Sequence, residues 1–307
     1  MISALVDKVS EVVLGKEKEI QLALACIFAK GHLLIEDIPG IGKTTLAKSL
    51  AKILGLDFKR IQCTSDMLPG DILGVSIFDQ KSAQFHFHKG PVFTQILLAD
   101  EINRTTPKTQ SALLEAMEEL QVTIEGKTIA LEAPFFVIAT QNPLEQSGTY
   151  RLPESQLDRF LIRINLGYPN RAAEKSILRS GHEHHGSNNK IASEIQAMLN
   201  PEKIIEIQKQ IENVYVSDTL LDYIQNILDF SRVTPHFYIG LSPRAGKALL
   251  SAAKSWAFCC NRGNVIPEDV QEVLTYVTSH RLHSRETRQE FSKDSLTRIF
   301  SEVPLGK

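Results

Sequence analysis

The stretch IEDIPGIGKTT, residues 35–45, decides the fold of this chain. Its second half ends in Gly42-Lys43-Thr44, which is how a phosphate-binding P-loop ends. Its first half departs from the G-x-x-x-x-G-K-[ST] pattern, because Asp37 stands where the first glycine is expected. The rest of the sequence must therefore show whether this segment binds a nucleotide or is an ordinary glycine-rich turn.

The context of the segment favours a nucleotide site. An apolar run, LLIED, precedes it, and the helical pattern KTTLAKSLAKIL follows it. At such a junction, backbone N–H groups at a helix amino end converge on phosphate oxygens. Asp tolerates left-handed backbone conformations, so Asp37 can replace glycine at the turn. We expect nucleotide contacts from Pro39, Gly40, Ile41, Gly42, Lys43, Thr44 and Thr45, with Thr44 also a ligand of Mg²⁺.

A second element carries the chemistry of phosphate hydrolysis. TQILLADE, residues 94–101, reads as a buried strand that ends in Asp100 and Glu101. Buried carboxylates need a partner or a metal ion. We expect Asp100 to hold Mg²⁺ and Glu101 to orient and deprotonate an attacking water. A lone Asp-Glu pair at a strand end is common, but beside a P-loop it predicts ATP hydrolysis.

The apolar pattern predicts an α/β fold. Short apolar runs alternate with helical patterns in the first half of the chain, and their continuous hydrophobicity indicates a parallel sheet covered on both faces. From about residue 201 the pattern is helical only. We therefore predict a doubly wound α/β core over residues 1–168, a linker over 169–200 and an all-helical lid domain over 201–307. The expected strands are 32–36, 58–63, 95–100, 135–140 and 160–166.

Inserts interrupt the core pattern in the first half. Residues 121–133 read as a β-hairpin that turns around Glu125-Gly126-Lys127. Residues 72–90 contain strand-like runs where a helix is expected. Both inserts are candidates for contact with a substrate, and the alternative is that they pack locally against the core.

Composition sets limits on location and partners. Lys and Arg number 34 against 36 Asp and Glu, so no global charge favours nucleic acid. No apolar run approaches the roughly 18 residues of a membrane span, and the first residues lack the apolar core of a signal peptide. We therefore expect a cytoplasmic protein, with its four cysteines as buried thiols.

Two groups of histidines resemble metal ligands, but neither has the arrangement of a metal site. His182-Glu-His-His185 contains metal-ligating residue types, but they are consecutive and no second cluster is placed to complete a zinc shell. His86 and His88 share one face of a predicted strand, where solvent or subunit contact is the better interpretation.

Ordered motifs along the chain resemble those of one family. These are Asp100-Glu-Ile-Asn-Arg104, then PKTQSALLEAMEE, then Ala139-Thr-Gln-Asn-Pro143, then LPESQLDRF. Together with the P-loop they resemble the MoxR family of AAA+ ATPases over nearly the whole chain. A P-loop of the form Glu-Asp-x-Pro-Gly-x-Gly-Lys-Thr occurs in that family, so the resemblance also accommodates Asp37.

The resemblance implies further roles. Asn142, on a strand between the two Walker strands, would be the sensor 1 residue that reads the γ-phosphate. Arg159 would be an arginine finger for the ATP of a neighbouring subunit. Arg244 would be the sensor 2 residue that brings the lid onto the nucleotide. Arg104 would act either at the subunit interface or in a surface ion pair. The segment that packs on adenine would be Val13, Leu14 and Gly15.

The resemblance also implies a function. Such ATPases assemble into rings, here expected to be hexamers, and remodel or mature client proteins with partners that carry von Willebrand factor A domains. ATP and Mg²⁺ are the expected cofactors. Alternatives are a nucleotide-gated scaffold with little turnover and a DNA-handling motor. The near-neutral charge and the Glu125 at the tip of the 121–133 hairpin count against DNA.

Overall fold

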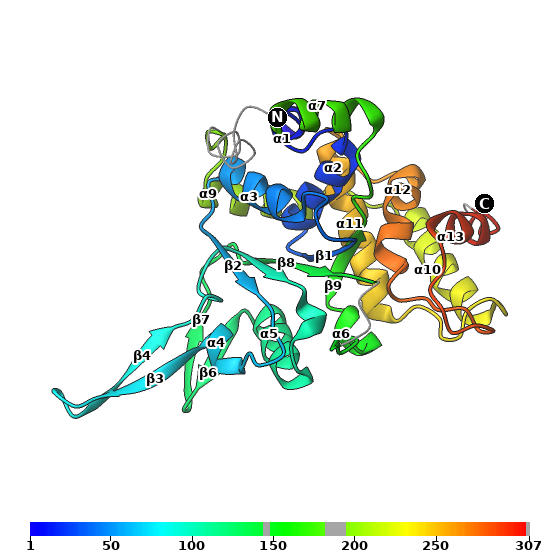
Figure 1. The fold of residues 1–307 in the computed structure, drawn as a ribbon. Coiled ribbons are helices and arrows are strands. Elements are labelled where there is room, and N and C mark those ends of the chain that lie inside the picture. The colour runs from blue at the N-terminus through cyan, green and yellow to red at the C-terminus, as the bar shows by residue number, and fades with distance from the viewer. Residues whose placement is uncertain (144–147, 182–194, 305–307) are drawn as a thin grey trace.

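A parallel β-sheet forms the centre of the molecule. The computed structural model describes residues 1–143, 148–181 and 195–304. Five parallel strands pair in the order β2-β5-β8-β1-β9 (Figure 1). This confirms the predicted α/β class, and each strand lies within a few residues of its expected position. The bounds are β1 (His32–Glu36), β2 (Phe58–Gln62), β5 (Ile96–Asp100), β8 (Phe136–Gln141) and β9 (Phe160–Ile164).

Helices cover the sheet, and local sequence explains where they begin and end. Gly55, in the left-handed region at φ 64°, ends α3. Thr106 caps α5 by accepting a hydrogen bond from the Thr109 N–H, and Pro107 occupies its first turn, as expected from the sequence. The helices of this part are α1 (Ile2–Ser10), α2 (Glu17–Phe28), α3 (Lys43–Leu54), α4 (Pro69–Leu73), α5 (Pro107–Glu119) and α6 (Glu154–Leu157), with the 3₁₀ turn η1 (Ile102–Arg104).

The C-terminal part is helical, as predicted. The side chains of Ser217 and Ser242 cap α10 and α11 by accepting backbone N–H groups three residues on. These helices pack on the sheet domain rather than standing apart. The helices are α9 (Pro201–Glu212), α10 (Asp218–Val233), α11 (Pro243–Cys259), α12 (Pro267–Thr278) and α13 (Lys293–Phe300).

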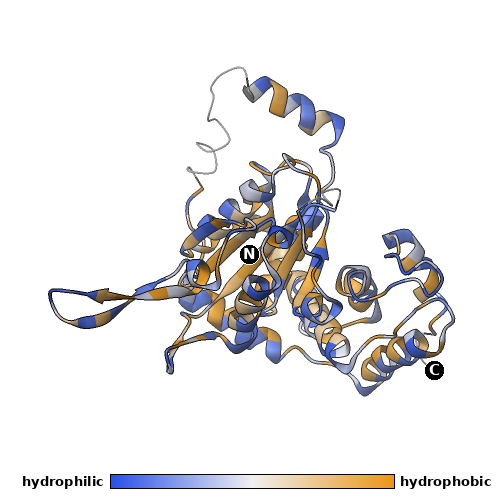
Figure 2. Ribbon diagram, turned by 60° about the horizontal axis from the view of Figure 1, so that its bottom comes forward, coloured by the Kyte–Doolittle hydropathy of each residue, from blue (hydrophilic) through white to orange (hydrophobic). Residues whose placement is uncertain are grey.

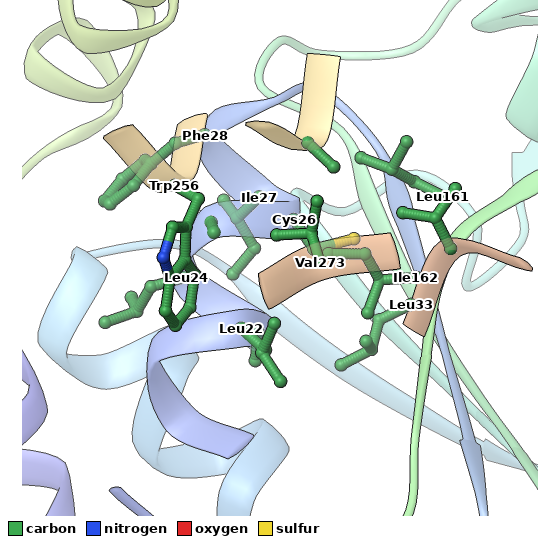
Figure 3. Packing of buried hydrophobic residues seen from close by; sticks show 14 of the residues in the cluster. Leu22, Leu24, Cys26, Ile27, Phe28, Leu33, Leu161, Ile162, Trp256 and Val273 are labelled. Carbon is green, nitrogen blue, oxygen red and sulfur yellow. The ribbon is translucent and has the colours of Figure 1, made fainter. Parts of the chain in front are cut away.

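One apolar cluster joins the C-terminal helices to the core. Figure 3 shows Trp256 of α11 beside Phe28 of α2, with Val273 of α12 near Ile162 of β9. Burying a large apolar side chain stabilises a fold by roughly 1.5–3 kcal/mol. The contacts therefore fix the position of the helical part relative to the sheet.

The segment predicted as a linker contains a helix. Helix α7 (Arg171–Gly181) lies inside residues 169–200. The Asn170 side chain accepts the Ala173 N–H at 2.9 Å, so Asn170 caps this helix. An Asn before RAAEK is a recognisable start signal, which the interpretation as a linker overlooked. The His182–His185 cluster lies outside the described residues.

The predicted hairpins are present. The first pairs β3 (Gly74–Asp79) with β4 (Gln84–Lys89), and the second pairs β6 (Gln121–Ile124) with β7 (Lys127–Ala130). Glu125 and Gly126 both have positive φ, as a tight hairpin turn requires. The β3–β4 hairpin projects far from the body of the molecule (Figures 1 and 2). Its Ile77, Phe78 and Phe85 are about half exposed or more, which argues against local packing.

Three of the four cysteines lie in the interior of the protein. Cys26, Cys63 and Cys259 are buried as expected, but Cys260 is exposed because it follows the last turn of α11. In the described ranges, no helix is both long and apolar enough to cross a membrane.

Candidate nucleotide site

The P-loop joins the carboxyl end of β1 to the amino end of α3. Gly40 and Gly42 have φ of 84° and 99°, and a Cβ at either position would meet nothing within 4 Å. No described side chain caps the amino end of α3. Free N–H groups, a helix dipole and open space beside two glycines are what a phosphate group needs.

Lys43 is already held in this loop. Its side chain is 9% exposed, and Nζ donates to the Asp37 carbonyl oxygen at 2.6 Å. Burial lowers the pKa of Lys43, while the charges of Asp100, Asp37 and Glu101 act in the opposite direction. The ammonium group therefore lies among carboxylates where a phosphate would gain from its charge.

The structure corrects the reason given for Asp37. Asp37 is not among the described residues with positive φ, so no left-handed turn explains its presence. Its carboxylate instead accepts two backbone hydrogen bonds, from the Ile38 N–H at 2.9 Å and from the Gly167 N–H at 2.6 Å. The aspartate therefore ties the P-loop to the segment that follows β9, which a glycine could not do.

Asp100 lies at the carboxyl end of β5 and is 8% exposed. One carboxylate oxygen accepts the Thr140 hydroxyl at 2.6 Å, and the other pairs with Arg60 Nη2 at 2.6 Å. The Thr140 hydroxyl also accepts the Glu101 N–H at 2.9 Å. Asn142 follows β8 directly and is buried, and β8 lies between β5 and β1 as expected.

Glu101 occupies a left-handed backbone position at φ 58°. Its Oε2 accepts hydrogen bonds from Gln62 Nε2 and Arg104 Nη1, each at 3.0 Å. Arg104 thus forms an ion pair with the predicted base in this chain, and its role at a subunit interface stays a prediction. Sequence reasoning missed Arg60, Gln62 and Thr140, because only the sheet order places β2 and β8 beside β5.

The segment expected at adenine lies near the same loop. Val13 is buried, and Gly15 has φ 69°, where a Cβ would come within 2.9 Å of the Asn170 side chain. Lys16 Nζ donates to the Tyr168 carbonyl at 3.0 Å. Since Asp37 binds the neighbouring Gly167, the Val13-Leu14-Gly15 segment and the P-loop meet across the chain that leaves β9.

A second charged cluster contains the predicted arginines. Arg159, just before β9, donates from Nε to Glu118 Oε2 at 2.6 Å. Arg244, in the first turn of α11, donates from Nη2 to Glu118 Oε1 at 2.9 Å. The hydrogen bond from Arg159 lowers the pKa of Glu118. Burial acts to raise this pKa, and the positive charge of Arg244 helps to lower it. Arg244 Nε also lies 3.9 Å from Asp158 Oδ2.

This cluster lies at the opposite edge of the sheet from the P-loop. His32 begins β1, and its Nε2 contacts the carbonyl oxygen of Met117, next to Glu118, at 3.1 Å. The P-loop follows the other end of the same strand, which spans roughly 16 Å at about 3.3 Å per residue. Glu118 therefore holds Arg244 beside Arg159 and away from the P-loop of its own chain, and the sensor 2 role of Arg244 stays a prediction.

A pocket of about 300 Å³ opens at this edge, and it is rich in cations. It is lined by Lys30, Glu118, Arg159, Arg244, Lys247 and Arg281, among others. In the parts of the chain that the structure describes, no group of three or more His, Cys, Asp or Glu could hold a metal ion by itself. His86 and His88 thus belong to no such group.

Comparisons with known proteins agree with the fold. The family described as "ATPase family associated with various cellular activities (AAA)" matches residues 32–162, and an AAA lid domain matches residues 229–299. The chain is 45% identical over 277 residues to the uncharacterized protein YeaC of Bacillus subtilis, covering 90% of this chain and 85% of that protein.

Two further relatives are informative. The chain is 38% identical over 285 residues to chaperone MoxR1 of Mycobacterium tuberculosis, covering 90% of this chain and 74% of the relative. A solved structure from Cytophaga hutchinsonii superposes with a TM-score of 0.87 at 36% identity. The match covers 99% of this chain and 94% of that one.

Proposed function

Since this chain belongs to the MoxR family of AAA+ ATPases, we propose that it hydrolyses ATP between neighbouring subunits and thereby remodels or matures a partner protein. The observation that carries this proposal is the distribution of charge over one sheet. The P-loop and the Asp100-Glu101 pair meet at the carboxyl edge, while Arg159 and Arg244 meet at the amino edge. Both arginines lie away from the P-loop of their own chain, which supports a role at the ATP of a neighbouring subunit.

The carboxyl edge would bind the nucleotide. The free N–H groups of α3 and the Lys43 ammonium fit the β- and γ-phosphates. Thr44 and Asp100 would supply the oxygen ligands that Mg²⁺ prefers, and bound Mg²⁺ would neutralise phosphate charge. Pro39, Ile41 and Thr45 complete the proposed loop contacts, and the Val13-Leu14-Gly15 segment would take the adenine.

Hydrolysis needs a base and a water in line with the phosphate. Glu101 would accept the proton of that water, and Asn142 would orient the water against the γ-phosphate. The contacts of Glu101 with Gln62 and Arg104 hold its carboxylate at the strand end. These roles make Glu101 the residue whose loss should stop turnover but not binding.

The amino edge would complete the site of the next subunit. Arg159 would stabilise the charge that develops on the transferred phosphoryl group, which is worth about 10³–10⁵ in rate for such arginines. Arg244 would join it from the lid. A closed ring forms when each subunit gives one edge and receives another and the rotation between subunits closes, and we propose a hexamer.

Two observations indicate a protein partner: membership of the family and the exposed surface of one hairpin. A client with a von Willebrand factor A domain is the expected partner class. The β3–β4 hairpin supports protein contact, because it projects from the body and carries exposed Ile77, Phe78 and Phe85 (Figure 2).

Paired variants test the proposal. Glu101→Gln should bind ATP but release no phosphate, and Arg159→Ala should bind ATP with a rate of phosphate release lowered about 10³-fold or more. Lys43→Ala should fail to bind ATP. Mixing Arg159→Ala with Lys43→Ala subunits should restore part of the activity, since each variant supplies the half-site that the other lacks. Inactive mixtures, in assemblies shown to contain both variants, would refute hydrolysis between subunits.

A trap variant tests the client. Glu101→Gln held in ATP should retain a client protein in affinity purification, whereas Lys43→Ala should not. Equal recovery with both variants would argue against ATP-dependent remodelling.

A further inference from the structure

One carboxylate holds both arginines of the amino edge, and we propose that Glu118 is the positioning residue that presents Arg159 and Arg244 together to the neighbouring subunit's ATP. This inference rests on the proposed function. It assigns a role to a residue that the sequence motifs left without one.

The contact with Glu118 leaves the terminal nitrogens of Arg159 free, whereas Arg244 makes its contact through the terminal Nη2. Glu118 accepts from Nε of Arg159, the nitrogen nearest the backbone, at 2.6 Å. Among the described residues, no bond to the terminal nitrogens of Arg159 is present. Those terminal nitrogens form the fork that pairs with phosphate oxygens. The contact thus restrains the side chain without occupying the part that would meet the phosphate.

The contact also joins separate elements. Glu118 is on α5, Arg159 precedes β9 and Arg244 begins α11. Helix α5 has 13 residues, which corresponds to roughly 20 Å. It starts shortly after Asp100-Glu101 and ends at the amino edge, where the His32 contact with Met117 anchors its last turn. Glu118 is therefore placed by a rigid element, and it sets the lid arginine relative to the core arginine.

Charge explains why an acid is needed. Two guanidinium groups side by side repel each other, and one carboxylate shared between them cancels part of that repulsion. Asp158 cannot take this role fully, because it pairs with Arg281 at 2.6 Å. One negative charge against two positive charges leaves a net positive edge for an incoming phosphate. Glu118 is about one-third exposed at its side chain, so an approaching subunit can reach the pair.

The test compares Glu118→Gln with its neighbour Glu119→Gln. Glu119 is exposed on the same turn of α5 and makes none of the contacts described at the amino edge, so it is the matched control. We expect Glu118→Gln to lower kcat roughly 10- to 100-fold, as misplaced catalytic groups do, with unchanged KM and ATP binding. Glu118→Asp, which keeps the charge, should recover part of the rate. Assembly is checked by light scattering in the same samples.

Removing both arginines separates positioning from a structural role. In an Arg159→Ala/Arg244→Ala background, whose residual rate is measured in single turnover, Glu118→Gln should cause little further loss, because both residues that it positions are gone. A full additional loss would overturn the inference, as would an unchanged or raised kcat in Glu118→Gln alone. If Arg159→Ala itself keeps full activity, the proposed function fails instead, so the two failures are distinguishable.

Discussion

Acid should weaken this fold through one buried histidine. His32 opens β1, and both ring nitrogens are engaged: Nδ1 accepts the Val137 N–H at 3.0 Å, and Nε2 contacts the Met117 carbonyl at 3.1 Å. This arrangement requires a neutral ring with the proton on Nε2. Burial lowers the pKa of His32 to about 4, and the hydrogen bond to Met117 only partly opposes it.

The size of the effect follows from that shift. The reference pKa is 6.5, so the unfolded chain takes up a proton as the pH falls below 6.5 while the folded chain does not. The stabilisation by His32 is therefore present above pH 6.5 and is lost as the pH falls toward 4. Between pH 7 and pH 5 the loss amounts to about 2 kcal/mol.

Urea unfolding at pH 7 and pH 5 measures this loss. The wild type should lose about 2 kcal/mol more than His32→Gln between these pH values. His280 is also buried with a lowered pKa, but it is present in both proteins and cancels in the comparison. Equal pH dependence of the two proteins would refute the reasoning that a neutral His32 links α5 to the sheet.

Other substitutions give further predictions. Asp37→Gly should keep ATP binding, measured with a fluorescent analogue, whereas Lys43→Ala should lose it. Asp37→Gly should also lower the free energy of unfolding by roughly 1.5–3 kcal/mol, because the hydrogen bond from the Gly167 N–H to the carboxylate is lost. Gly31→Ala should cost about 1–3 kcal/mol in urea unfolding, because its Cβ would lie 2.4 Å from that of Leu161. Arg163→Ala should cost about 3–5 kcal/mol in the same assay, since it leaves a largely buried carboxylate without its partner; a loss below 1 kcal/mol would contradict this.

Local signals predicted most of the core. Continuous apolar runs placed all strands of the sheet, and a Ser, Thr or Pro at the start placed α5, α10 and α11. Two differences between the predictions and the structure also have local causes. The cap signal at Asn170 was overlooked, so α7 was taken as linker, and the acid at position 37 was explained by backbone conformation although its side chain provides the reason.

The sequence by itself predicted which residues form the candidate nucleotide site, because strand, glycine turn, lysine and paired carboxylates occur within short, ordered motifs. Only the tertiary structure decided how the site is divided. Glu118, Arg159 and Arg244 lie far apart in the chain and meet because α5 returns to the amino edge of the sheet and α11 packs beside it. No local pattern encodes such a meeting, since it depends on sheet order and on the apolar packing of the lid against α2 and β9.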